Sequence, residues 1–344
     1  MMPNMLETLE MNLARGADEA DALATWPAVS WAALMNSGVA GWSIPRAFGG
    51  QELGQADQLA VSELISSACL TTAFILSQRE AAIRHVLRGP EHLKQEYLPE
   101  LAQGKTFITI GLSQLTTSRQ HQGPALRVEQ LTKSEFKLHG EIPWVTGAPQ
   151  AKAVVVGATL DNGEQALFLL PTNVSGVTVD PILSLSSLVG SQTSSVRCEN
   201  VLLSEQYLLA GPKERVLGGG GGGGLETSCL ALGLTKAATN FLREESKNRI
   251  ELVAIADRLE LELKQSRAQM LLLAADPQME AVLELRAQCT LLALRSSQAA
   301  LLFAKGKGFV QPHPAQRWSR QALFFLVWSC PRSVTEQIAS GLLL

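Results

Sequence analysis

Apolar and polar positions divide the chain into a helical part, a β-rich part and a second helical part. Residues 1–105 are predicted to be helical. Leu53 to Leu76 is a long apolar-rich stretch without proline. Glu91 to Leu101 follows, with Pro90 near its start and Gly104 just past its end, which is the usual asymmetry of a helix.

The pattern changes after residue 105 to short apolar runs, several of them rich in β-branched residues. Asp161-Asn162-Gly163 lies between two of these runs and is a hairpin-type turn signal. The runs are Phe107 to Ile110, Val154 to Gly157, Ala166 to Leu170, Val177 to Val179 and Ser195 to Leu203. They predict a β-rich central domain over residues 106–215.

A helical pattern returns at Leu225 and predicts a C-terminal bundle over residues 225–344. Helices are expected over Met279 to Ala304 and Arg317 to Val327. A third is indicated by apolar residues at helix-compatible intervals, namely Leu259, Leu263, Met270 and Leu273.

Seven consecutive glycines, Gly218 to Gly224, separate the β-rich part from this bundle. Each glycine loses much backbone freedom when it is ordered. The run also lacks the G-x-x-x-x-G-K-[ST] spacing of a phosphate-binding loop. We therefore expect a flexible linker over residues 216–224 rather than a phosphate site.

Composition narrows the class of protein. The chain has 344 residues, of which 46% are hydrophobic and 18% charged, so a large core is expected. Its net charge of −3, with scattered Lys and Arg, argues against nucleic-acid binding. No signal peptide or membrane span is expected.

The cysteines and histidines predict no metal site or disulfide. The five Cys are an odd number and are widely spaced, and the five His lack metal-ligand spacing. Reduced, mostly buried thiols in a cytoplasmic protein are the expectation.

Several segments carry a resemblance to one family. Gly38 to Gly50 fits G-x-x-G-x-x-x-P-x-x-[YF]-G-G, and Lys94 to Gly104 fits K-x-x-Y-L-P-x-L-x-x-G. Near the end, Lys305 to Phe309 and Pro314 to Ala322 precede Trp328 to Pro331. Together they resemble the acyl-CoA dehydrogenase family over nearly the whole chain. The resemblance implies an α+β fold with an N-terminal helical domain, a central β-barrel or sandwich domain and a C-terminal helical bundle.

The resemblance implies FAD as the cofactor. Trp144 and Thr146 follow Gly140 and resemble the family's G-x-K-x-W-I-T-N. By that similarity Trp144 would lie against the flavin ring and Thr146 would hydrogen-bond flavin N5. The alternative is a strand-end tryptophan in the core.

Other implied FAD contacts are less complete. Ser113 keeps the first hydroxyl of the family's T-E-P-x-x-G-S-D loop, which here reads Ser113 to Arg119. Arg249 corresponds to an arginine that touches the neighbouring subunit's FAD, although a solvated helix-end arginine fits as well. Gly306 and Gly308 match glycines near the adenine half of FAD, or form a simple turn between helices.

The family's usual catalytic glutamate is absent, because Ser329 occupies its position. A hydroxyl is a very poor base near neutral pH, and Cys330 would need an electropositive setting to act as a thiolate. Some relatives carry the base on the first helix of the bundle, which makes Glu226 the candidate. Its alternative role is that of an acidic residue in a helix's first turn. Glu336 is expected on a solvated helix face.

Three functional hypotheses follow. The first is an FAD-dependent oxidoreductase of acyl-CoA dehydrogenase type, acting on the CH–CH group of an acyl thioester on CoA or a carrier protein. The second is a catalytically degenerate homologue that binds or supports a partner. The third keeps FAD for chemistry without a carboxylate base, such as oxygen activation. Fold similarity alone does not establish the chemistry.

Partners are predicted from the same resemblance. They are an acyl thioester, an electron acceptor and further copies of the chain in a homodimer or homotetramer. Leu291 to Leu294 and Phe324 to Leu326 carry more apolar surface than one bundle needs, and these faces are expected to join the subunits.

Overall fold

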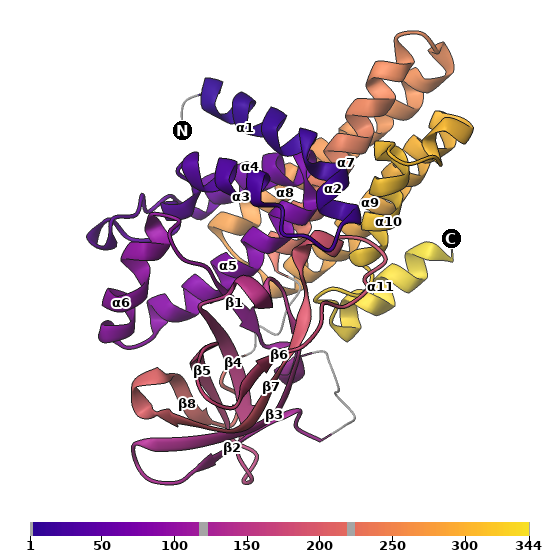
Figure 1. Cartoon of the computed structure of the whole chain (residues 1–344). Coiled ribbons are helices and arrows are strands. Elements are labelled where there is room, and N and C mark those ends of the chain that lie inside the picture. Colours follow the sequence, from indigo (N-terminus) through magenta and orange to yellow (C-terminus); the bar gives the residue numbers. More distant parts are fainter. Residues whose placement is uncertain (1–2, 117–122, 219–223, 344) are drawn as a thin grey trace.

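Helices form the two ends of the chain and strands form its middle in the computed structural model (Figure 1). The structure describes residues 3–116, 123–218 and 224–343. The predicted α+β architecture of helical, β and helical parts is confirmed. Residues 117–119 of the predicted flavin loop and residues 219–223 of the predicted glycine linker lie outside the described residues.

The N-terminal part consists of six helices within the described residues. They are α1 (Pro3–Arg15), α2 (Ala17–Ala22), α3 (Ala28–Asn36), α4 (Gln55–Ala68), α5 (Leu70–Arg88) and α6 (Glu91–Ala102). The apolar stretch from Leu53 to Leu76 is divided at Cys69, whose φ of −152° and ψ of 101° are extended. Helix α5 therefore starts a new direction, and it packs against both β1 and α7.

The central part is one mixed sheet in the order β6-β7-β3-β2-β4-β5-β8, with β1 paired to β4. Its strands are β1 (Ile108–Gly111), β2 (Leu126–Gln130), β3 (Glu135–Val145), β4 (Ala153–Thr159), β5 (Gln165–Pro171), β6 (Val177–Val179), β7 (Ser194–Ser204) and β8 (Leu208–Lys213). The predicted hairpin is confirmed, because β4 and β5 are antiparallel around Gly163, whose φ is 87°. Strands β2, β3 and β8 were not predicted.

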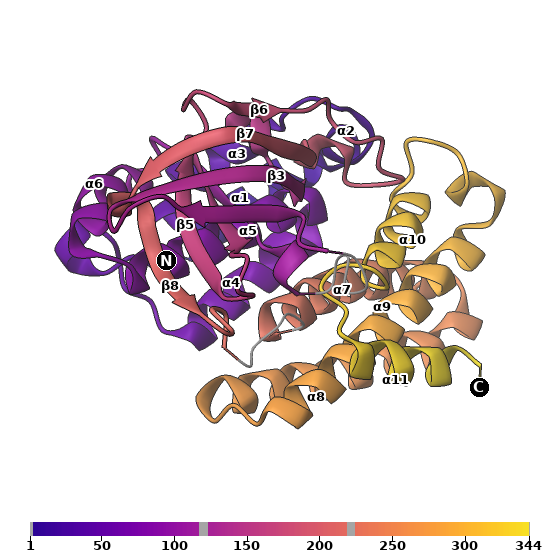
Figure 2. The ribbon, with the colours of Figure 1, turned by 90° about the horizontal axis from the view of Figure 1, so that it is seen from below.

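The C-terminal part holds α7 (Leu225–Ser246), α8 (Val253–Ala275), α9 (Met279–Gly308), α10 (Pro314–Phe324) and α11 (Arg332–Leu342). Figure 2 shows these helices beside the sheet rather than on its strands. The predicted helix period of the second helix is confirmed, since Leu259, Leu263, Met270 and Leu273 are all buried. No described helix is long and apolar enough to cross a membrane.

Three large apolar clusters hold the parts together. The first joins α4 and α5 to the bundle through residues such as Leu59 and Leu230. The other two lie on opposite faces of the sheet, so Val154 and Val155 on β4 enter different clusters. Burial on both faces explains why β4 is an unbroken apolar run.

The predicted subunit-joining faces are for the most part buried within the chain itself. Leu292, Ala293 and Leu294 are at most 4% exposed and Phe325 is fully buried, so they serve the chain's own core. Exposed apolar side chains of the bundle include Ile250, Leu272, Leu302, Phe309, Val310 and Val327.

Candidate active site

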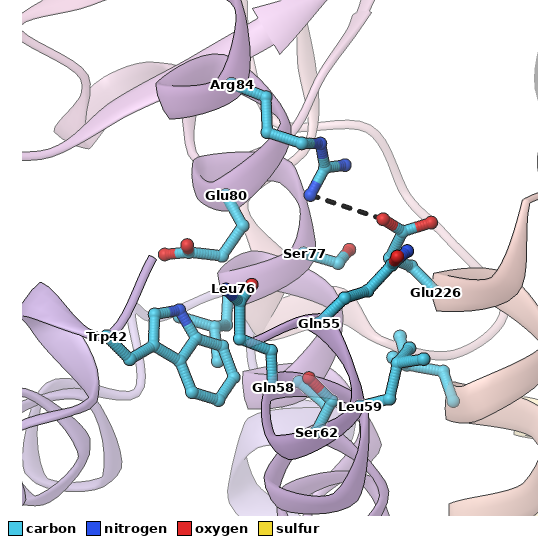
Figure 3. A pocket seen from close by; sticks show the side chains of 12 residues that line it. Trp42, Gln55, Gln58, Leu59, Ser62, Leu76, Ser77, Glu80, Arg84 and Glu226 are labelled. Atoms are coloured by element: carbon cyan, nitrogen blue, oxygen red, sulfur yellow. Dashed lines mark ion pairs between the residues drawn. The ribbon is translucent and has the colours of Figure 1, made fainter. Parts of the chain in front are cut away.

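A pocket lies where α4, α5 and the start of α7 meet (Figure 3). Helix α5 contributes a single face to it, because Ala73, Leu76, Ser77, Glu80 and Arg84 are spaced three or four residues apart. The other lining residues are Trp42, Gln55, Gln58, Leu59, Ser62, Glu226 and Leu230. The pocket thus combines an apolar floor with several charged and amide groups.

Glu226 reaches the pocket from the first turn of α7. Its Oε1 lies 3.4 Å from Arg84 Nη1, and the two side chains are 40% and 39% exposed. Figure 3 shows the two groups pointing toward each other. The sequence prediction that placed Glu226 in a helix's first turn is confirmed, and the same residue also lines the pocket.

Glu80 is a second carboxylate on the pocket wall, but its own partners hold it. Arg79, which is fully buried, donates to Glu80 Oε1 at 2.6 Å, and the Ser43 hydroxyl donates to Oε2. Arg79 also donates to the carbonyls of Ala40 and Leu101. Burial lowers the pKa of Arg79, and the adjacent carboxylate opposes that shift. Glu80 is therefore a structural counter-ion.

The residues predicted to face the flavin ring lie at the end of β3. Trp144 is 50% exposed, so it is not the core tryptophan of the alternative interpretation. Thr146 is buried, and its Oγ1 lies 3.2 Å from Thr193 Oγ1, which lies 2.9 Å from Ser191 Oγ. Three buried hydroxyls thus form a chain that ends at Thr146. If Ser191 donates to Thr193 and Thr193 donates to Thr146, the hydroxyl proton of Thr146 is free to be donated to a ligand.

Ser113 begins a short 3-10 turn directly after β1. Gln114 fixes this turn by donating to the carbonyls of Gly111 and Gly157, at 3.0 and 2.8 Å. The Ser113 hydroxyl is buried and has no hydrogen-bond partner among the described residues. A buried polar group without a partner costs free energy. The hydroxyl is therefore suited to a ligand atom.

Arg249 is engaged within its own subunit. It donates to the Phe303 carbonyl at 2.8 Å and pairs with Glu245 and Glu251 at 3.7 and 3.2 Å. Its guanidinium also lies over the Phe303 ring. A contact with FAD stays a prediction, and it would require Arg249 to exchange some of these partners.

Gly306 and Gly308 end α9, where Lys305 interrupts the helix with a φ of 58°. A Cβ built on Gly306 would meet no atom within 4 Å, so its backbone lies open to an approaching ligand. A Cβ on Gly308 would collide with Ala304. The contact with the adenine half of FAD remains a prediction for both glycines, and only Gly306 has open space beside its backbone.

Ser329 lies between α10 and α11, in a segment tied down by Arg286. This arginine is fully buried and donates to the carbonyls of Phe325 and Trp328, at 2.8 and 3.1 Å. Burial lowers the pKa of Arg286 to about 10. Ser329 itself has a φ of 49° and is not among the residues that line the pocket. Glu336 on α11 is exposed and pairs with Arg332, as predicted for a solvated helix face.

The predicted site residues thus fall into two groups. Trp144, Thr146 and Ser113 gather at the sheet, while Glu226 lies at the pocket between the helices. Sequence reasoning missed Arg84 and Trp42 as pocket residues. The available signal was the charge on α5, since Arg79, Glu80 and Arg84 follow the apolar residues of its first half.

Comparison with solved structures defines the fold. The three-part fold is similar to that of acyl-CoA dehydrogenases of known structure. The structure of butyryl-CoA dehydrogenase from Megasphaera elsdenii superimposes with a TM-score of 0.85 at 17% identity, covering 100% of this chain and 99% of that one. A glutaryl-CoA dehydrogenase from Mycobacterium smegmatis, solved with FADH2, gives a TM-score of 0.84 at 18% identity, covering 98% and 93%. At such identities these structures show the fold alone.

The sequence comparisons agree with the fold. Residues 4–105 match the model of the acyl-CoA dehydrogenase N-terminal domain. A probable acyl-CoA dehydrogenase of Bacillus subtilis, YngJ, is 22% identical over 247 residues, which is 69% of this chain and 65% of that protein. These similarities support membership of the acyl-CoA dehydrogenase family, with the family model matching the N-terminal part of the chain. Its matches to the first three curated relatives span only 51% to 65% of their lengths.

Proposed function

We propose that this protein is an FAD-dependent oxidoreductase that acts on the CH–CH group of an acyl thioester, carried by CoA or a carrier protein. Glu226 would be its catalytic base. The observation that carries the proposal is the position of Glu226 on the wall of a pocket between α4, α5 and α7, while the usual base position holds Ser329.

The chain's own residues fit FAD. Ser113 offers a buried hydroxyl without a partner, and Trp144 offers a half-exposed indole face. Thr146 ends a hydroxyl chain, and its proton is free to donate to a ligand if Thr193 donates to it. The backbone at Gly306 is open to close approach. When bound there, FAD would supply a two-electron acceptor for a hydride from the substrate's β-carbon.

Each site residue would have a distinct role in the proposed reaction. A Glu226 oxygen would accept the proton from the α-carbon as the hydride leaves the β-carbon, so a double bond forms between the two carbons. The electrons would then pass to an external electron acceptor. Thr146 would orient the ring by donating a hydrogen bond. Glu80 would keep its structural role, because Arg79 and Ser43 already hold it.

The test starts with the visible spectrum of the purified protein. Flavin bands, followed by anaerobic bleaching with acyl thioesters, are the expected result. Glu226→Gln keeps the shape of the side chain but removes the base, and it should slow bleaching about 10²–10⁴-fold. Glu336→Gln changes an exposed carboxylate on α11 and is the matched control. Equal bleaching rates in both variants would remove Glu226 from the proposal.

A degenerate, non-catalytic homologue is the second candidate, because the pocket volume is only about 30 Å³. That enclosed space holds about two water-sized groups, so an extended acyl chain would not fit within it and would have to reach beyond it. A colourless protein that cannot be reconstituted with FAD would favour this candidate. Flavin bands without bleaching by any thioester would instead leave oxygen activation to be tested.

Assembly and location are also proposals. A homodimer or homotetramer would cover the exposed apolar side chains of the bundle, among them Phe309, Val310 and Val327. A cytoplasmic location is proposed from the five cysteines, which are all free thiols, four of them buried. Size-exclusion chromatography with light scattering tests the assembly.

A further inference from the structure

The pocket that holds Glu226 has a mostly apolar lining that also carries several polar groups. Trp42 and Glu80 lie on one side in Figure 3, and Arg84 with Glu226 lies on the other. Gln55 and Ser77 add further polar groups to the lining. An alkyl chain would leave these groups without water and without new partners, which costs free energy.

One of these polar groups lacks a partner. Trp42 is 1% exposed, and its indole Nε1 has no hydrogen-bond partner among the described residues. Indole is a donor only, so the missing partner must be an acceptor. Since buried polar groups in folded proteins are almost always paired, this donor calls for an oxygen acceptor, which water or a ligand in the pocket can supply.

The charges in the pocket are balanced among themselves. Arg84 is paired with Glu226, and Glu80 is paired with Arg79. A substrate carboxylate would therefore add an unbalanced negative charge beside two glutamates. A substrate ammonium would have to compete with two arginines. A neutral oxygen acceptor meets neither cost.

The size of the pocket sets a second limit. Its enclosed space of about 30 Å³ has room for about two water-sized groups. A medium or long alkyl chain would extend beyond this space toward the open side of the pocket or against the helices α4, α5 and α7, which pack in the main apolar core. The pocket is thus suited to a short acyl group.

We propose that the substrate is a short acyl thioester whose acyl end carries a neutral oxygen, such as a hydroxyl, that accepts a hydrogen bond from Trp42 Nε1. This inference rests on the proposed function and specifies its substrate class. Trp42 is then a specificity-determining residue. A saturated hydrocarbon acyl group and a dicarboxylic acyl group are the excluded classes.

The experiment measures binding of four thioesters to the flavin-loaded protein by isothermal titration calorimetry. The probes are butyryl-CoA, 4-hydroxybutyryl-CoA, glutaryl-CoA and octanoyl-CoA. We expect 4-hydroxybutyryl-CoA to bind about tenfold more tightly than butyryl-CoA, because it gives a buried donor its partner. Trp42→Phe keeps an aromatic ring but removes the N–H, and it should abolish the difference between these two ligands.

Each contrary result has a distinct meaning. Butyryl-CoA or octanoyl-CoA binding as tightly as the hydroxyacyl thioester overturns the inference, as does glutaryl-CoA binding most tightly or no thioester binding at all. A ratio unchanged by Trp42→Phe removes Trp42 as its cause. The wild-type ratio decides the substrate class even if this variant fails to fold. Anaerobic bleaching of the flavin is recorded in a separate experiment. If no bound thioester bleaches the flavin, the proposed function is overturned, and the binding ratio still tests the substrate class.

Discussion

Asp21 joins all three parts of the molecule, and its removal should destabilise the whole chain. This carboxylate on α2 is 1% exposed. Its Oδ1 accepts from the backbone N–H of Leu188 at 2.9 Å and from Gln321 Nε2 on α10 at 2.8 Å. Its Oδ2 lies 2.6 Å from Arg320 Nη2. The loop that Leu188 begins leads directly to Thr193 and so to the hydroxyl chain.

The size of the loss in stability depends on which hydrogen-bond partners of Asp21 would stay buried without a new partner. Asp21→Ala strands the Leu188 N–H and the Gln321 amide, whose residues are 0% and 2% exposed. Each unsatisfied buried group costs about 1–3 kcal/mol. Arg320 is 31% exposed and can turn to solvent, so its share is small. We expect a loss of about 3–5 kcal/mol in the free energy of unfolding.

Urea unfolding, followed by circular dichroism, measures this loss. Asp21→Asn keeps an oxygen acceptor but loses the charge, and it should cost about 1–2 kcal/mol. Asp257→Ala on α8 is the control, because Asp257 is 61% exposed and Arg243 retains Glu260. The control should cost less than about 1 kcal/mol. If Asp21→Ala costs no more than Asp257→Ala, water has replaced the carboxylate and the reasoning is refuted.

Two further predictions concern protonation and the flavin. Burial, reinforced by two neighbouring arginines, lowers the pKa of His85 to about 4. Between pH 6.5 and 4 the unfolded chain therefore binds more protons than the folded chain, so the free energy of unfolding should fall by up to about 3 kcal/mol on acidification. His85→Gln should remove this pH-dependent loss, which urea unfolding curves at pH 6.5 and pH 4 would measure. Thr193→Val breaks the hydroxyl chain behind Thr146. It should make the reduction potential of bound flavin more negative by about 10–30 mV in a spectroscopic titration, and an unchanged potential would contradict a positioning role.

The sequence predicted the elements whose burial is strong or whose turn chemistry is explicit. Strands β4 and β5 are buried along almost their whole length, and the Asp161 to Gly163 turn between them is a local signal. Strand β2 was missed because three of its five residues are exposed and polar, which resembles a loop. The break at Cys69 has no local signal, since no Gly or Pro marks it.

The sequence predicted only those site residues that lie in or near recognisable motifs. Trp144 and Thr146 came from resemblance, because their segment keeps the family's spacing. Glu226 came only from its neighbourhood at the start of the first bundle helix, because it does not keep the family's spacing to Gly233. Trp42 and Arg84 lie far apart in the sequence and meet only when α5 packs beside the turn that precedes α4. No local pattern carries that information. The loss of a partner for an indole N–H becomes visible only when the packing is known.

The choice between two pocket carboxylates can be argued from the strength of their ion pairs. Glu80 is 5% exposed and is held by a fully buried arginine, and breaking such a pair costs about 3–5 kcal/mol. The Glu226–Arg84 pair is longer, and both side chains are about 40% exposed, so opening it costs about 0–1 kcal/mol. A base must leave its resting partner in every turnover to reach the substrate carbon. Glu226 can do so at little cost, whereas Glu80 would have to unsettle the contacts of Arg79 with Ala40 and Leu101. A serine at position 329 therefore does not by itself deprive this pocket of a usable carboxylate.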